Sequence, residues 1–132
     1  MGALGSPTAA GWKALNIIIV EDEPFIALDI ESAIEALDHR VVGVADTKAA
    51  AIALARGTPC DGALIDIRLR DGFTGPEIAD VFREEFGIPF AFLTGNAEQL
   101  AADSRGALAV VGKPFTQGQL AEVLQFFQAA RS

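Results

Sequence analysis

The chain has 132 residues, 51% of them hydrophobic and 21% charged, which suits one packed domain and not a disordered segment. Eighteen acidic residues outnumber ten basic ones, and the net charge of -8 argues against nucleic-acid binding, because phosphate backbones attract clustered Lys and Arg. The single Cys excludes an internal disulfide and a cysteine metal cage. With no apolar run long enough to span a bilayer and no signal peptide, we expect a cytoplasmic protein that does not contact membranes.

The first folded elements follow a short polar segment. Residues 1–14 are rich in Gly, Ala, Ser, Thr and Pro, and we interpret them as a flexible tail or an expression remnant; residues 15–132 are then the domain. Residues 16–20 form a β-branched apolar run, typical of a strand buried on both faces. Apolar residues at helical spacing predict a helix from Pro24 to about Leu37.

A second strand and a second helix come next. His39, the single histidine, has no second ligand beside it in the sequence, and we interpret it as a surface residue. Residues 41–45 predict a short strand. Asp46 or Thr47 then caps an Ala-rich helix that ends near residue 56.

The apolar run 63–69 is interrupted by one carboxylate, Asp66. An unpaired charge inside a buried strand would be destabilising, so we expect Asp66 at the end of that strand, where a cation or a reacting group can reach it. The alternative is that Asp66 merely begins an ordinary turn with Asp71 and Gly72. A third helix opens at Pro76.

Two further strands complete the pattern. Residues 90–94 are apolar and end in a hydroxyl, and a weak helical segment over 97–103 follows them. Residues 107–111 predict the fifth strand, and a last helix begins near residue 116. Five strands alternating with five helices predict an α/β, flavodoxin-like, doubly wound parallel sheet with strand order 2-1-3-4-5.

Each candidate polar side chain follows the carboxyl end of a predicted strand. These residues are Glu21, Asp22, Asp66, Thr94 and Lys113. In this strand order the ligand crevice lies at the ends of strands 1 and 3, so we expect the side chains to converge there. Packed carboxylates repel one another, and a divalent cation such as Mg²⁺ relieves that repulsion. A carboxylate beside a cation, a Lys and a hydroxyl is equipped to attack phosphorus, which predicts an aspartyl phosphate at Asp66.

Together, Glu21-Asp22, Asp66, Thr94-Gly95 and Lys113-Pro114-Phe115 resemble the receiver domain of two-component response regulators, over residues 15–131. The resemblance implies a phosphoacceptor signalling domain and not an enzyme acting on other molecules. Its Asp66 would take a phosphoryl group from a phosphohistidine on a histidine kinase or a histidine phosphotransfer protein.

The resemblance also assigns roles around the phosphoacceptor. Asp22 and Asp66 would ligate Mg²⁺, with Glu21 acting mainly through water and Arg68 supplying its backbone carbonyl. Thr94 and Lys113 would bind the phosphoryl oxygens, and the Lys113–Pro114 bond would be cis.

Two departures from the usual receiver pattern concern signalling. Many receivers carry an aromatic residue where this chain has Val110, and the chain contains no Tyr. The loop after Asp66 also lacks a Pro often found after its Leu. These features, with the residues 89–95, are similar to the FATGUY type of single-domain response regulator. In that interpretation the signalling change falls on the segment 96–106, as an order–disorder transition.

Three apolar side chains off the main helical stripes are candidate contacts. Phe25 and Leu28 could dock the helices of a kinase, although flanking core packing against the last helix is the favoured interpretation. Phe126 is a candidate for a homodimer face.

Other protein classes remain as alternatives. A haloacid-dehalogenase-like phosphatase would need an acid two positions after its nucleophilic Asp, where this chain has Arg68. A flavin carrier is disfavoured because Glu21-Asp22-Glu23 would repel the flavin phosphate. A receiver-like interaction module that is not phosphorylated also stays open, as does the choice between a stand-alone regulator and part of a longer protein.

Overall fold

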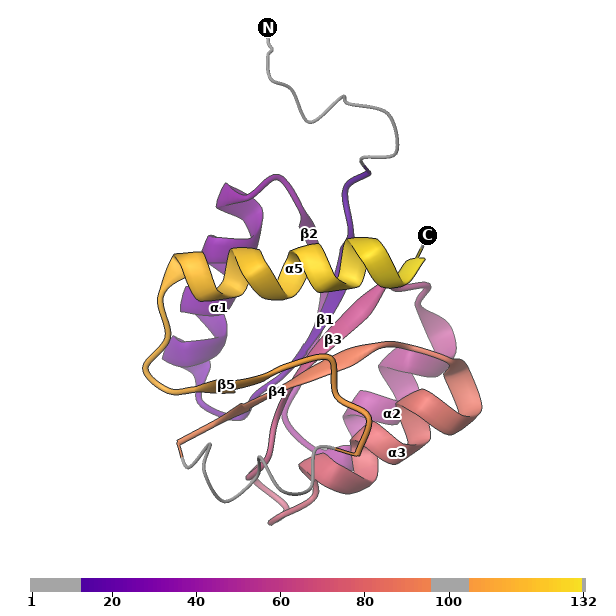
Figure 1. Cartoon of the computed structure of the whole chain (residues 1–132). Coiled ribbons are helices and arrows are strands. Elements are labelled where there is room, and N and C mark those ends of the chain that lie inside the picture. Colours follow the sequence, from indigo (N-terminus) through magenta and orange to yellow (C-terminus); the bar gives the residue numbers. More distant parts are fainter. Residues whose placement is uncertain (1–12, 96–104, 132) are drawn as a thin grey trace, which may run out of the picture.

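A computed structural model describes residues 13–95 and 105–131, and Figure 1 draws the other residues in grey. Within the described residues, five parallel strands form one sheet in the order β2-β1-β3-β4-β5. The strands are Asn16–Val20 (β1), Arg40–Ala45 (β2), Gly62–Asp66 (β3), Phe90–Thr94 (β4) and Val110–Gly112 (β5). The strand order predicted from the sequence is confirmed.

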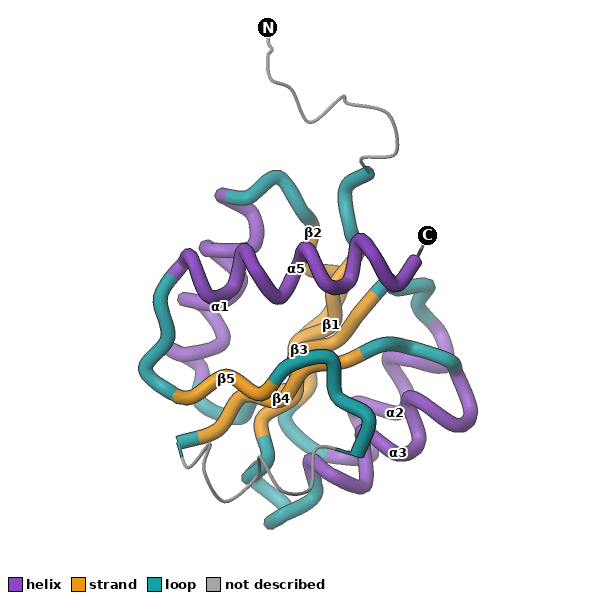
Figure 2. The backbone as a smooth tube through the Cα atoms, viewed as in Figure 1, coloured by secondary structure: helices purple, strands orange, loops and turns teal. Residues whose placement is uncertain are grey.

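Helices cover both faces of the sheet, with α1 and α5 on one face and α2 and α3 on the other (Figures 1 and 2). The helices are Pro24–Ala36 (α1), Lys48–Gly57 (α2), Gly75–Phe86 (α3) and Gln117–Arg131 (α5). The described residues thus hold four helices, where the sequence predicted five. The predicted helix over 97–103, and with it most of the segment 96–106, lies outside the described residues. None of the described helices is long and apolar enough to cross a membrane.

The central strands are apolar throughout because both of their faces are covered. In β1, Ile17 and Ile19 pack with α1 and α5, whereas Ile18 and Val20 belong to the core under α2 and α3. All four side chains are fully buried. This two-sided burial explains why these strands show continuous apolar runs and not an alternating pattern.

Local signals set the ends of the helices. The Thr47 hydroxyl caps α2 by accepting the Ala50 N–H at 3.2 Å, and Gly87 ends α3 with a φ of 64°. At α5, Thr116 and Gln119 form a reciprocal capping box: the Gln119 side chain accepts the Thr116 N–H at 2.8 Å, and the Thr116 hydroxyl accepts the Gln119 N–H at 3.1 Å.

The last strand begins later than predicted. The sequence placed it at 107–111, but β5 is Val110–Gly112. The preceding residues already run beside β4, since the Leu108 N–H bonds the Phe90 carbonyl at 2.9 Å and the Phe92 N–H bonds the Ala109 carbonyl at 3.0 Å. The apolar run therefore begins before the regular ladder.

His39 is not the surface residue that the sequence suggested. Its side chain is 8% exposed, and its Nδ1 accepts the Leu15 N–H at 2.8 Å. A ring nitrogen that accepts a hydrogen bond is unprotonated, so His39 is neutral and ties the start of β1 to the turn before β2. No local pattern around His39 indicates this contact, which joins the segments leading into β1 and β2 across 24 positions of the chain.

Candidate functional site

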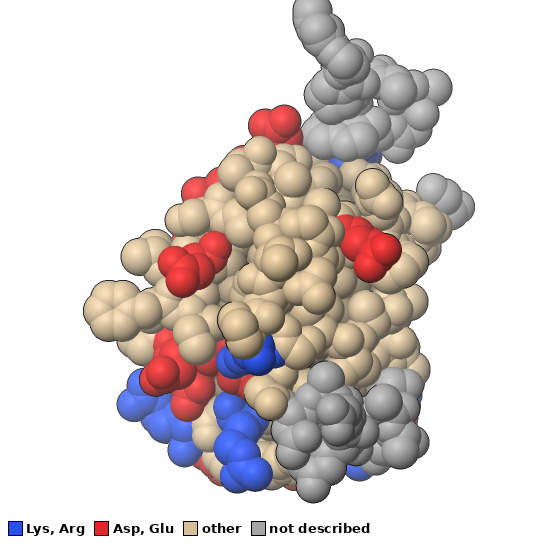
Figure 3. Space-filling view, turned by 60° about the vertical axis from the view of Figure 1, so that its left-hand side comes forward, with Lys and Arg blue, Asp and Glu red and all other residues tan. Residues whose placement is uncertain are grey.

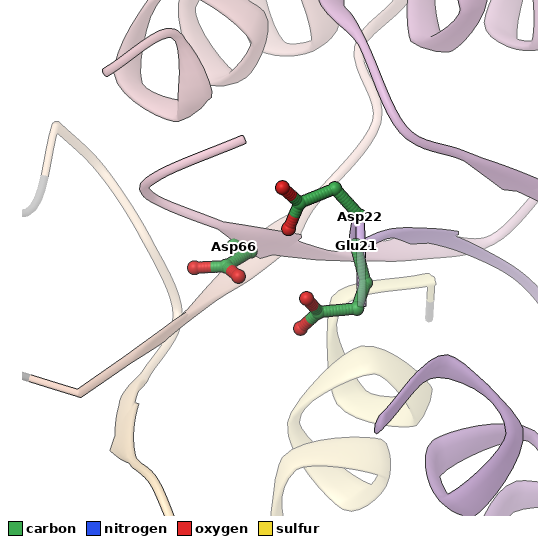
Figure 4. Close-up of side chains that lie close together, drawn as sticks. All are labelled: Glu21, Asp22 and Asp66. Atoms are coloured by element: carbon green, nitrogen blue, oxygen red, sulfur yellow. The ribbon is translucent and has the colours of Figure 1, made fainter. Parts of the chain in front are cut away.

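Three carboxylates meet at the ends of two neighbouring strands. Glu21 and Asp22 follow β1 directly, and Asp66 is the last residue of β3, which pairs with β1. Each residue contributes a carboxylate oxygen to a group whose members all lie within 4.8 Å of one another. Figure 4 shows the three carboxyl groups directed into a common space beside the strand ends. The predicted convergence of these residues is thus present in the structure.

Lys113, which follows β5, joins two of these carboxylates. Its Nζ donates to Glu21 Oε1 at 2.7 Å and to Asp66 Oδ2 at 2.8 Å. The Lys113 side chain is 18% exposed, that of Asp66 10%, and that of Glu21 is fully buried. The peptide bond between Lys113 and Pro114 is cis, as the family resemblance implied.

Burial and neighbouring charge shift the protonation equilibria of this pair. The pKa of Glu21 is raised from 4.5 to about 6: burial is the main cause and the nearby Asp66 charge adds to it, while the bonds from Lys113 and from the Glu23 N–H and the Lys113 charge limit the rise. Burial by itself lowers the pKa of Lys113, but the bonds and charges of Asp66 and Glu21 outweigh it, so the net shift is upward. Lys113 therefore stays an ammonium.

The loop after β3 holds the second oxygen of Asp66. The Arg68 N–H donates to Asp66 Oδ1 at 3.3 Å, and the Gly75 N–H closes the loop on the Ile67 carbonyl at 3.0 Å. A Cβ added at Gly75 would lie 2.3 Å from the Asp66 carbonyl oxygen, so only glycine fits there. The Arg68 side chain is turned outward, with its guanidinium 5.7 Å from the centre of the Phe73 ring.

Thr94 lies at the end of β4, the strand beside β3. The residue is 7% exposed, and its carbonyl accepts the Lys113 N–H at 2.8 Å. This bond sets Lys113 directly beside the end of β4. Val110, which stands where many receivers have an aromatic residue, pairs with Phe92 in the ladder between β4 and β5.

The donor set fits a divalent cation. Three carboxylates against one ammonium leave two unbalanced negative charges when all are ionised, which is the charge that one divalent ion would neutralise. The group offers oxygen ligands, which Mg²⁺ prefers over nitrogen and sulfur. Both oxygens of Glu21 accept hydrogen bonds, from Lys113 and the Glu23 N–H, and both oxygens of Asp66 accept them from Lys113 and the Arg68 N–H. A cation would therefore use the remaining lone pairs of these oxygens, together with the Asp22 carboxylate.

A groove of about 430 Å³ lies next to this site, between α1 and the start of α5. Its apolar lining includes Ile26, Phe115 and Leu120, and Lys113 forms part of its wall. On α1 itself, Phe25 is 82% exposed and Leu28 57% exposed. The sequence favoured core packing for these two residues, which is wrong, because the buried stripe of α1 is Ala27, Ile30 and Ile34.

Charged side chains are unevenly distributed over the surface. On the face drawn in Figure 3, basic side chains gather beside acidic ones at the lower left, while most of the remaining face is uncharged. On this face a largely uncharged area thus adjoins a strongly charged one.

Residues 17–125 match the family model of the response regulator receiver domain, and the chain belongs to this family. Over 120 residues it is 35% identical to the phyllosphere-induced regulator PhyR of Methylorubrum extorquens, covering 87% of this chain but 45% of that protein. The chain thus spans about half the length of this relative. The family model and the strand order together identify a signalling domain of the receiver type.

Solved structures agree with this assignment. SdrG of Sphingomonas melonis Fr1 is 37% identical with a TM-score of 0.73, covering 86% of this chain and 96% of that one. The anti-anti-sigma factor PhyR of Bartonella quintana is 30% identical with a TM-score of 0.81, covering 90% of this chain and 49% of that one. The receiver domain of the sensor histidine kinase PA1611 of Pseudomonas aeruginosa is 26% identical with a TM-score of 0.74, covering 89% of this chain and 99% of that one. That structure is described with a magnesium ion coordinated in its active site cleft.

Proposed function

We propose that this domain receives a phosphoryl group on Asp66 from a phosphohistidine of a histidine kinase or a histidine phosphotransfer protein. The observation that carries the proposal is the Lys113 ammonium bonded to both Glu21 and Asp66, at 2.7 and 2.8 Å, beside the acidic group. A carboxylate in water is a weak nucleophile toward a charged phosphoryl group, because like charges repel. An ammonium fixed against it lowers that repulsion.

The chemical step exchanges one bond to phosphorus for another. A carboxylate oxygen of Asp66 forms the new bond, the bond from phosphorus to the imidazole nitrogen breaks, and the departing imidazole takes up a proton. The Arg68 N–H and the Lys113 ammonium hold the two Asp66 oxygens in place before attack. During transfer, Lys113 neutralises charge on the phosphoryl oxygens and the Thr94 hydroxyl donates to one of them.

The cation belongs to this proposal as a ligand of Asp22, Asp66 and the Arg68 carbonyl, with Glu21 acting through water. When bound, Mg²⁺ would supply positive charge to the phosphoryl oxygens, as it does in other phosphoryl transfers. The protein itself contributes the oxygen donors at one edge of the sheet and holds the Lys113 ammonium between the Glu21 and Asp66 carboxylates.

The test uses a small phosphodonor. The protein is incubated with Mg²⁺ and acetyl phosphate, and intact mass is followed from seconds to hours beside an Asp66→Asn variant. A gain of about 80 Da in the wild type and not in the variant is the expected result. If neither protein gains mass at short times and low temperature, the domain is an interaction module that is not phosphorylated. If both gain it, another residue is the acceptor.

For the partner, we propose that helices of the phosphodonor protein dock on α1 and the adjoining groove. Support comes from the exposure of Phe25 and Leu28 and from the position of Lys113 in the groove wall. Replacing Phe25 by Asp would slow transfer from a phosphohistidine protein but leave the reaction with acetyl phosphate unchanged. An equal slowing of both reactions would place the defect in the site and not in docking.

The relatives suggest where such a signal leads. Because the Bartonella relative is an anti-anti-sigma factor, we propose that this receiver acts in a circuit that controls a sigma factor, by binding a regulatory protein when phosphorylated. Phosphorylated and unphosphorylated domain would be titrated with the anti-sigma factor of the same organism. Equal affinity of the two forms would refute this output.

A further inference from the structure

The loop between β3 and α3 is tied to the start of α2 by Asp71. Its Oδ2 accepts the Lys48 N–H at 3.0 Å, and its Oδ1 accepts the Thr74 hydroxyl at 2.7 Å. Lys48 is the first residue of α2, so its N–H is one of the helix-end donors that no helical carbonyl satisfies. Asp71 therefore caps a helix that lies 23 positions earlier in the chain.

Both contacts favour the ionised carboxylate. The bond from the Lys48 N–H, followed by that from the Thr74 hydroxyl, holds the pKa of Asp71 below its ordinary value. A negative charge at the amino end of a helix is also favoured by the helix dipole. Asp71 is therefore ionised at neutral pH and acts as an acceptor for both donors.

The loop transmits the position of Asp71 to the phosphoacceptor. Leu69 and Gly72 exchange two backbone hydrogen bonds, at 2.8 and 3.0 Å, and so close a tight turn around Asp71. The residue before this turn, Arg68, donates its N–H to Asp66. A shift of Asp71 thus moves the backbone of Arg68, whose carbonyl is the proposed metal ligand.

We propose that Asp71 is a positioning residue, which fixes the backbone of Arg68 against Asp66 by anchoring the loop on the amino end of α2. The inference rests on the proposed function, because it requires the Arg68 carbonyl to be a ligand of the bound cation. Mg²⁺ requires near-octahedral ligands at about 2.0–2.1 Å, so a loosely held carbonyl would bind it poorly. Outer contacts that orient metal ligands commonly change affinity by about 10- to 100-fold.

Two ion pairs lie near these elements but do not hold the loop in this way. Arg70 pairs with Asp46 at 3.1 Å, with side chains 65% and 46% exposed. Lys48 Nζ pairs with Glu77 at 2.8 Å, with side chains 37% and 57% exposed. Exposed ion pairs of this kind contribute little, so Glu77→Gln is a suitable control: it removes an ion pair to the same lysine but leaves the Lys48 N–H bonded to Asp71.

The experiment compares wild type, Asp71→Ala, Asp71→Asn and Glu77→Gln. Mg²⁺ affinity is measured by calorimetry, and amide exchange of Leu69, Gly72 and Gly75 by NMR in metal-free protein. The Ala and Asn variants lose the same charge, but an Asn side chain can still accept the Lys48 N–H and donate to the Thr74 oxygen. The difference between them therefore reports the hydrogen bonds and not the charge.

We expect Asp71→Ala to lose about tenfold in Mg²⁺ affinity and to exchange the three amides about tenfold faster. Asp71→Asn would recover most of both losses, and Glu77→Gln would resemble wild type. Equal behaviour of the Ala and Asn variants, or of the Ala variant and wild type, would overturn the inference. If wild type bound no Mg²⁺ and gained no phosphoryl group, the proposed function would fail, whereas the exchange data would still decide whether Asp71 anchors the loop.

Discussion

Replacing Lys113 by Met removes the ammonium that bridges Glu21 and Asp66 but keeps a side chain of similar length. In the folded protein this leaves the buried Glu21 carboxylate without its strongest partner, whereas in the unfolded chain water solvates it. We expect the variant to be less stable than wild type by about 3 kcal/mol at pH 7.5, and by about 1 kcal/mol at pH 5.

The pH dependence follows from the pKa of Glu21. That pKa is raised from 4.5 to about 6, and each pKa unit is worth about 1.4 kcal/mol, so ionised Glu21 already costs the folded protein about 2 kcal/mol. Without Lys113 the penalty for the ionised Glu21 rises, but it cannot exceed the free energy of protonating Glu21 instead. At pH 7.5 that free energy is about 4 kcal/mol, because the pH lies about three units above the ordinary pKa. The Glu21 part of the loss is thus about 2 kcal/mol, and the lost hydrogen bond to Asp66 adds about 1 kcal/mol.

The sign is fixed by the direction of the shift. A carboxyl group whose pKa is raised on folding binds its proton more tightly in the folded state, so its penalty is absent below about 4.5 and develops as the pH rises through about 6. At pH 5 protonating Glu21 requires little free energy, so the stability loss of Lys113→Met comes almost only from the lost hydrogen bond to Asp66.

Urea unfolding followed by circular dichroism, in EDTA at both pH values, measures these losses. Lys48→Met is the matched control, because Lys48 Nζ is also 2.8 Å from a carboxylate, that of Glu77, but the pair is exposed. This control should lose less than about 1 kcal/mol at either pH. The reasoning is refuted if Lys113→Met loses no more than the control at pH 7.5, or if its loss is the same at pH 5.

Three further predictions concern other parts of the molecule. A Cβ at Gly62 would lie 2.6 Å from the Phe127 ring, so Gly62→Ala should lower the free energy of unfolding by about 1–3 kcal/mol. Adding Phe127→Leu should recover part of that loss in urea unfolding, whereas a simple sum of the two single losses would contradict the contact. Burial lowers the pKa of His39, so its contribution to stability is present above its ordinary value of 6.5 and lost as the pH falls below it; His39→Gln should weaken the pH dependence of the melting temperature in this range. Protons compete with a cation near Glu21, so Mg²⁺ affinity should rise with pH through about 6 in calorimetry, and Glu21→Gln should flatten that rise.

The sequence predicted the position of the site because each of its residues is tied to a strand end. Asp66 ends a fully buried strand, and Glu21 and Asp22 follow another, so the predicted strand order was enough to bring the three together. The pairing of Lys113 with Glu21 joins residues 92 positions apart, and strand order also accounts for it. Long-range geometry was predictable where strands carry the residues.

Contacts made by loops could not be predicted in the same way. Asp71 entered the sequence analysis only as a turn residue in the alternative interpretation of Asp66, and nothing in its local sequence indicates that the Lys48 N–H at the start of α2 donates to it. Phe25 was misplaced for a related reason. Helical periodicity gives the angle between side chains around an axis, but it does not say whether a neighbouring element covers them, and α5 leaves Phe25 uncovered.

Lys113 connects the two parts of the proposed function. Its ammonium bonds Asp66, and the same residue lines the groove between α1 and α5. A phosphoryl group on Asp66 would draw that ammonium toward itself and change the wall of the groove. Binding and phosphorylation are then coupled, and thermodynamic linkage requires the coupling to be reciprocal. If phosphorylation weakens a partner's affinity for the groove tenfold, the bound partner must disfavour the phosphorylated state tenfold, so a docked phosphodonor would be released as its phosphoryl group is delivered.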